Sequence, residues 1–230
     1  MMRTKNISTF ISSLAISLLL FTQAAHAQSA RKVIAELQRD TIPFFRGFAV
    51  SADLIGPLEY ALSDYGQFEA SLRINLKDKY FPTIEVGLGK ANRSDDITLM
   101  EYKTSAPFGR IGCDFNIMKD KHDIYRILVG ARYAFTSFKY DLYHPDITDP
   151  VWGGESPYQA EGVKCSYHWL ELAAGVDVKI WGPLHLGWSL RYKRRIAHNE
   201  GPLGNAWYVP GYGKSSGSRI SGLFNITFEI

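Results

Sequence analysis

The sequence predicts an all-β protein, a closed antiparallel transmembrane β-barrel of eight strands with short periplasmic turns and long extracellular loops. Two observations predict it: apolar and polar side chains alternate through repeated segments, and the connections between those segments alternate in length. The clearest segment runs from Gln67 to Leu76, where every even position is apolar and every odd position is polar. Because successive side chains of a strand point to opposite faces, this segment is expected to be a two-faced strand.

The same alternation, followed along the chain, defines seven further segments. In the first, Phe48 and Val50 share one face, and Ser51 and Asp53 share the other. The fifth has its main lapse at Leu128, on its more polar face. The expected strands cover residues 47–54, 67–76, 83–88, 110–117, 125–136, 169–180, 184–193 and 219–230.

The connections support a barrel in the outer membrane. Bacterial outer-membrane barrels have short periplasmic turns and long external loops. With the N-terminus in the periplasm, the short connections follow strands two, four and six, and the last strand returns the C-terminus to the periplasm. Short connections are expected at 77–79, 118–123 and 181–183, and long ones at 56–66, 91–104, 141–162 and 196–216.

The N-terminus has the features of an export signal. Arg3 and Lys5 precede an apolar stretch at 11–21, and Ala25-His26-Ala27 supplies small residues for cleavage. The apolar stretch is too short for a membrane-spanning helix, which needs about 20 apolar residues. We therefore expect a signal peptide at residues 1–27, a periplasmic N-terminal tail at 28–46 and the outer-membrane barrel at 47–230.

Charge and cysteine content exclude two classes. Loss of residues 1–27 would remove two of the 26 basic residues and none of the 23 acidic ones, which leaves a formal charge of +1 and no case for nucleic-acid binding. Cys113 and Cys165 are too few for a disulfide scaffold.

A soluble lipocalin-like carrier is the alternative barrel, because it is also two-faced, with its apolar face inside. The polar face favours the membrane barrel, since its acidic and basic groups nearly balance and its bases are mostly arginines, whose rigid forks suit buried carboxylates. In a narrow lumen these groups are expected to pair and plug the barrel. The expected lumen charge network consists of Glu69, Arg73, Glu85, Arg110, Asp114, Arg126, Arg132, Glu171, Asp177 and Arg191.

Aromatic residues gather at two further places. Those near the predicted turns, including Tyr80, Phe81, Tyr125, Trp181 and Phe228, fit an interfacial girdle. Those in the external loops mix with Gly, Pro, Asp and Asn, and they form either a contact surface or a rigid cap in which the loops pack on one another. The candidate loop contact surface consists of Tyr140, Tyr143, Trp152, Tyr158, Trp207, Tyr208 and Tyr212.

Several blocks resemble a known family. The stretches Leu54-Ile55-Gly56-Pro57 and Lys77-Asp78-Lys79-Tyr80-Phe81-Pro82, and the later blocks at 133–140, 149–154 and 204–214, resemble uncharacterised outer-membrane β-barrel proteins of Bacteroidetes, a family of unknown function. The resemblance covers nearly all of the chain after residue 27. It implies a barrel in the outer membrane of a Gram-negative bacterium and no assigned chemistry.

Small barrels include lipid-modifying enzymes, which would need a nucleophile beside a base. His185, Ser189 and Glu171 share the inward face, but four residues of strand separate His185 from Ser189 by about 13 Å, too far for a triad. The histidines and carboxylates of the external loops have no ligand spacing that fixes a metal. No catalytic residue, cofactor or metal is expected.

The sequence thus predicts a non-enzymatic outer-membrane scaffold with a plugged lumen. Its expected partners are outer-membrane lipids and lipopolysaccharide, together with an extracellular ligand or protein that meets the loops. A lipid-modifying outer-membrane enzyme and the soluble carrier are the alternatives.

Overall fold

The computed structural model describes residues 43–230, apart from 149–150, 152, 154, 200 and 205. The expected signal peptide and most of the expected tail lie outside the described residues. No helix in the part that is described is long and apolar enough to cross a membrane.

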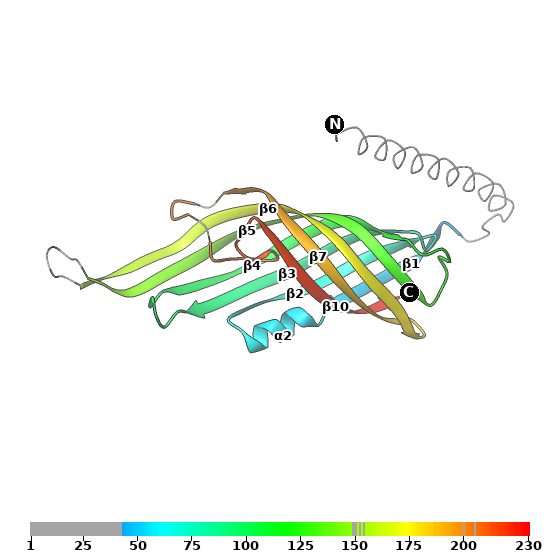
Figure 1. The fold of residues 1–230 in the computed structure, drawn as a ribbon, viewed down its shortest axis with the longest axis horizontal. Helices are drawn as coiled ribbons and strands as arrows, with labels where there is room; N and C mark the ends of the chain where they lie inside the picture. Colours follow the sequence, from blue (N-terminus) through cyan, green and yellow to red (C-terminus); the bar gives the residue numbers. More distant parts are fainter. Residues whose placement is uncertain (1–42, 149–150, 152, 154, 200, 205) are drawn as a thin grey trace, which may run out of the picture. The chain divides into compact units, whose positions relative to one another are not determined.

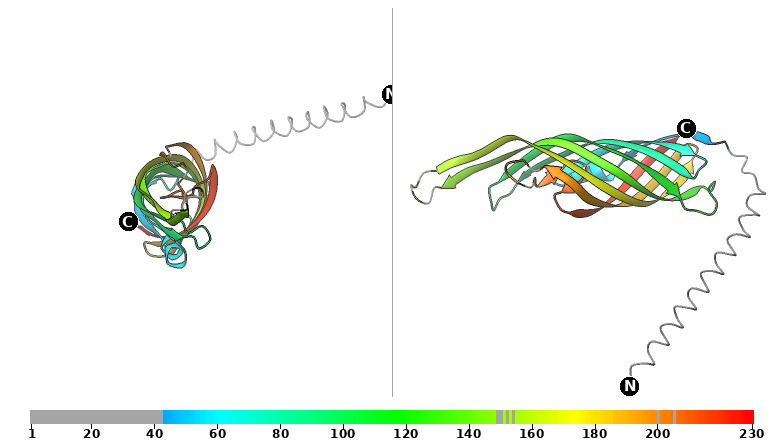
Figure 2. Two further views of the ribbon diagram at one scale, coloured as in Figure 1. Left: turned by 90° about the vertical axis from the view of Figure 1, so that its left-hand side faces the viewer. Right: turned by 90° about the horizontal axis from the view of Figure 1, so that it is seen from above.

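Eight strands form a closed antiparallel barrel in the order β1-β10-β7-β6-β5-β4-β3-β2 (Figures 1 and 2), which confirms the predicted fold class. From β1 to β7, neighbouring strands follow one another in the chain, and β10 pairs with both β7 and β1 to close the barrel. Two short strands, β8 and β9, come between β7 and β10 in the chain and pair with each other. The elements are β1 (Phe45–Asp53), α2 (Ile55–Leu62), β2 (Tyr65–Leu76), β3 (Tyr80–Ser94), β4 (Glu101–Asn116), β5 (Tyr125–Thr148), β6 (Glu155–Trp181), β7 (Leu184–Asn199), β8 (Tyr208–Val209), β9 (Gly213–Lys214) and β10 (Ser218–Glu229).

The two faces of the barrel wall differ in polarity as the alternation predicts. Outward-facing Leu172 and Val86 are 61% and 59% exposed, whereas inward-facing Glu171 and Glu85 are buried. Leu128, the lapse in the alternation, is buried in the lumen. Apolar side chains therefore surround a charged interior.

Phe81 departs from the expected aromatic girdle. Its side chain is buried on the lumen side, where the guanidinium carbon of Arg126 lies 5.4 Å from the ring centroid. Its odd position in β3 puts it on the same face as Glu85, so parity decides its direction and proximity to a turn does not. Tyr80, Tyr125, Trp181 and Phe228 are exposed, in agreement with the girdle.

Two of the expected long loops are mostly strand. Within 91–104 the turn covers only 95–100 and the rest belongs to β3 and β4, and most of 141–162 belongs to β5 and β6. The alternation continues there with its polarity reversed: Phe138 and Tyr140 face inward and are buried, while Lys139 and Asp141 face outward and are exposed. The barrel thus extends past its apolar outer belt as a wall with a polar exterior.

The expected loop at 56–66 contains the helix α2, which lies against β2 and β10 (Figure 1). Strand β1 stops pairing with β10 at Asp53, and the Asp53 carboxylate then accepts hydrogen bonds from the backbone N–H groups of Ile55 and Gly56, at 3.2 and 2.8 Å. These bonds satisfy donors at the helix start, where no residue four positions earlier can accept them.

Candidate functional site

The middle of the lumen holds two arginines among three glutamates. Arg110 Nη1 lies 2.5 Å from Glu69 Oε2 and 3.1 Å from Glu85 Oε2, and Arg110 Nε lies 2.9 Å from Glu171 Oε1. Arg191 Nη1 lies 2.6 Å from Glu85 Oε2 and 3.2 Å from Glu69 Oε1. Each guanidinium thus bridges carboxylates from different strands.

Strand register brings part of this cluster together. Glu85 of β3 lies directly opposite Arg110 of β4, and Arg132 of β5 lies directly opposite Glu171 of β6. Arg132 then reaches Glu85 at 2.7 Å and Asp114 at 2.8 Å. Side chains that share the inward face of neighbouring strands are forced into contact, because a barrel of eight strands is only wide enough for its own side chains.

A second cluster lies nearer the ends of the strands joined by short turns. Arg126 Nη1 lies 2.7 Å from Glu229 Oε2, and Arg73 Nη1 lies 3.4 Å from Asp177 Oδ2. His185 lies between the two carboxylates, with Nε2 3.2 Å from Glu229 and Nδ1 3.6 Å from Asp177.

All ten residues named for the lumen network therefore lie on the inward face, and each has at least one oppositely charged partner. The network named from the sequence leaves out His185 and Glu229, which pair in the second cluster, and Lys193, which is buried. Parity alone placed these three on the same face, so the signal for them was present.

Little open space remains in this part of the lumen. A cavity of about 40 Å³ lies between the charged clusters, lined by hydroxyl and charged groups that include Ser51, Ser189 and Thr227. That volume has room for one or a few water molecules.

The segment 206–215, which contains the hairpin β8–β9, occupies the external half of the lumen. A cavity of about 370 Å³ remains between this segment, α2 and β10. Arg110 Nη2 donates to the carbonyl oxygen of Gly211 at 2.9 Å, and Lys193 Nζ donates to the same oxygen at 2.7 Å. The Tyr102 hydroxyl donates a hydrogen bond to the carbonyl oxygen of Tyr208, with 2.7 Å between the two oxygens. We call residues 206–215 the plug hairpin, because barrel side chains hold its backbone inside the wall.

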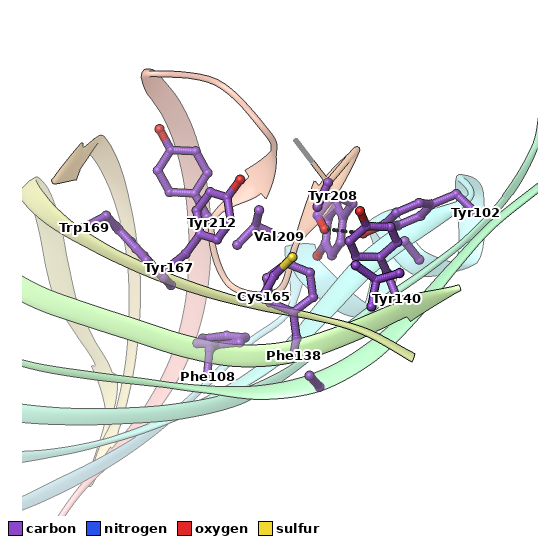
Figure 3. Close-up of a cluster of buried hydrophobic side chains, with 14 of the residues drawn as sticks. Tyr102, Phe108, Phe138, Tyr140, Cys165, Tyr167, Trp169, Tyr208, Val209 and Tyr212 are labelled. Carbon is purple, nitrogen blue, oxygen red and sulfur yellow. Dashed lines mark hydrogen bonds between the residues drawn. The ribbon is translucent and has the colours of Figure 1, made fainter. Parts of the chain in front are cut away.

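The plug hairpin is packed in an aromatic cluster drawn in Figure 3. The Tyr102 and Tyr140 rings stack with centroids 5.3 Å apart, and Trp169 meets Tyr212 edge to face at 5.6 Å. Gly211 has φ +80, and a Cβ on it would lie 2.4 Å from Cγ of Phe108, so only glycine fits this contact.

This packing corrects the expected loop contact surface. Tyr140, Tyr208 and Tyr212 are buried, so these three belong to the rigid cap instead. The loop folds back into the mouth of the barrel, and the aromatic rings are removed from water there. The sequence alone does not reveal that the loop folds back. Trp207 is half-buried, Tyr143 and Tyr158 are exposed, and Trp152 lies outside the described residues.

The described residues contain neither an assembled Ser–His–acid triad around His185 nor a group of side chains suited to a metal ion. His185 contacts Asp177 and Glu229 rather than Ser189. No group of three or more His, Cys, Asp or Glu side chains in the described ranges could hold a metal ion.

Comparison with known proteins identifies a family by sequence. A family model described as "Domain of unknown function (DUF6048)" matches residues 7–230, nearly the whole chain. The comparison with curated proteins finds no match.

Three solved structures are similar to this chain at low identity. Neisserial surface protein A (NspA) is 14% identical, with a TM-score of 0.43, over 81% of this chain and 99% of that one. A major outer membrane protein from Thermus thermophilus is 15% identical, with a TM-score of 0.42, over 80% and 98%. CarO2 of Acinetobacter baumannii is 11% identical, with a TM-score of 0.41, over 81% and 99%.

Proposed function

We propose that this chain, which belongs to the DUF6048 family, is a non-enzymatic outer-membrane barrel that acts as a non-conducting scaffold and presents its external rim to the cell envelope or to an extracellular ligand or partner. One observation supports the membrane location above all. The wall is apolar outside and charged inside, the reverse of a soluble carrier.

A soluble carrier would bury its apolar side chains around the ligand and expose its charges. Here the outward side chains of Ile84, Leu172 and Trp188 are all more than half exposed, while Arg110 and Glu171 are fully buried. A contiguous exposed apolar surface of this extent marks contact with lipid or with another protein. The belt encloses a closed barrel, so lipid is the medium that fits it.

The non-conducting role follows from what fills the lumen. The ion-pair network occupies the middle of the barrel and the plug hairpin occupies its external half, and Arg110 contacts both. An ion crossing the barrel would have to displace paired charges and packed rings, each at a cost of several kcal/mol.

The rim supports the presentation role. Tyr143 and Tyr158 are exposed on the strand extensions that pass beyond the apolar belt, and β5 and β6 pair there as a ribbon (Figure 1). Tyrosine suits contact surfaces because it offers a rigid apolar ring with a hydrogen-bonding end.

Membrane fractionation tests the proposal. The mature protein is expected to sediment with the outer membrane in a form that neither high salt nor alkaline carbonate releases. Recovery in the soluble periplasmic fraction would contradict the membrane barrel and favour the soluble carrier.

A further inference from the structure

We propose that a basic groove on the outer wall of the barrel binds the phosphate groups of outer-leaflet lipid headgroups, the chemistry that lipopolysaccharide presents. The inference rests on the proposed membrane location. The groove encloses about 520 Å³ and crosses strands β3, β4 and β5. Its lining includes Lys90, Asn92, Lys103, Ser105, Lys139 and Asp141.

The groove lies where the polarity of the outer wall changes. On β3, exposed Leu88 is followed on the same face by Lys90. On β5, exposed Phe135 is followed on that face by Ser137 and then Lys139. Hydrocarbon contact must end at this level, and lipid headgroups begin where it ends. The lysines thus stand at the height of the headgroup phosphates.

The lysines are short of counter-charge. Lys139 of β5 lies directly opposite Lys164 of β6, and like charges at such positions destabilise a sheet. Across the part of the chain that the structure describes, none of the ammonium groups of Lys90, Lys139 and Lys164 takes part in an ion pair or hydrogen bond. Lys103 differs, because it lies opposite Asp141.

A phosphate group supplies what this arrangement lacks. It carries the charge that would offset the Lys139–Lys164 repulsion, and its oxygens can accept hydrogen bonds from several ammonium groups at once. Ser105, directly opposite Lys90, adds a hydroxyl donor. Each basic residue beside an anionic lipid surface contributes about a fivefold gain in binding.

The test compares two triple variants of the full-length mature barrel in neutral detergent. The groove variant combines Lys90→Gln and Lys139→Gln, at two lysines that line the groove, with Lys164→Gln, at the lysine opposite Lys139 on β6. Lys77→Gln, Lys119→Gln and Lys179→Gln together remove the same charge from the opposite end of the barrel. Affinities for diphosphorylated lipid A and for dephosphorylated lipid A with the same acyl chains are measured by native mass spectrometry.

We expect the groove variant to lose at least about tenfold in affinity for the diphosphorylated lipid and to keep its affinity for the dephosphorylated one. The control variant should stay within about twofold of the wild type for both. Unchanged binding by the groove variant, or an equal loss in the two variants, would overturn the proposal.

Lys164→Glu provides a second measurement that does not depend on the triple variant folding. It converts the repulsive cross-strand pair into an attractive one, so the barrel should unfold at the same or a higher temperature while its lipid A affinity falls. Intact affinity in this variant would count against the groove. Because all affinities are measured on purified protein, their failure is separate from a failure of the fractionation test.

Discussion

At the scale of single residues, Glu85 pairs with more arginines than any other carboxylate of the lumen network. Its carboxylate lies 2.6 Å from Arg191, 2.7 Å from Arg132 and 3.1 Å from Arg110. All four side chains are buried, so each guanidinium depends on this carboxylate for part of its compensation.

Glu85→Ala should therefore lower the free energy of unfolding by about 3–5 kcal/mol, less if water enters the space. Glu101→Ala, at an exposed carboxylate on β4, is the matched control and should change it by about 0.5 kcal/mol or less. Urea denaturation of the barrel folded into lipid vesicles measures both. Equal small effects would mean that the network is solvated.

Parity predicted the inward direction of these residues, but it could not predict most of their partners. Glu85 and Arg110 are neighbours across a strand pair, which register could suggest, whereas Arg191 approaches Glu85 from β7 across the lumen. Contacts of that kind depend on how the sheet closes, and closure is a property of the whole barrel rather than of any segment.

Gly211 and Gly204 form a natural comparison within the loop between β7 and β10. Both have positive φ, at +80 and +83, but only at Gly211 would a Cβ meet the Phe108 ring. Alanine costs about 1–2 kcal/mol at either position because of its backbone, and overpacking adds about 1–3 kcal/mol at Gly211 alone.

Gly211→Ala should accordingly destabilise the plug hairpin and expose residues 206–215 to limited proteolysis, whereas Gly204→Ala should leave the cleavage pattern as in the wild type. Equal proteolytic sensitivity of the two variants would show that the hairpin is not held against Phe108.

At the scale of elements, the strands end where their surroundings change. The sequence alternation located all eight strands of the barrel but stopped β3 to β7 early at the external end. Beyond the apolar belt the same alternation continues with opposite polarity, as Phe138 and Lys139 illustrate. A search for apolar outward positions cannot follow that reversal, and the expected loops were therefore too long.

The apolar outer belt can be tested by placing a charge within it. Leu72→Arg, on the outer face of β2, should destabilise the barrel in vesicles by about 2–4 kcal/mol, because the guanidinium would face hydrocarbon. Ile97 is 94% exposed in the turn between β3 and β4, so Ile97→Arg should have an effect near zero. Vesicle refolding with urea titration compares them, and a larger effect at Ile97 would reverse the assignment of the belt.

At the scale of the whole molecule, the barrel joins two kinds of interior. Ion pairs occupy the middle of the lumen, and the plug hairpin with its aromatic packing occupies the external part. Arg110 links them through Glu171 on one side and the Gly211 carbonyl on the other. The sequence did not predict that the hairpin enters the lumen, because the residues that hold it, such as Tyr102 of β4 and Lys193 of β7, are far from each other in the chain.

We propose a closed lumen, and planar-bilayer recording of the purified protein tests that proposal most directly. The ion-pair network and the plug hairpin predict that the protein inserts without giving a stable open channel, at either polarity of the applied voltage. Sustained, ion-selective conductance from the wild-type protein would contradict the closed lumen and make transport the leading function.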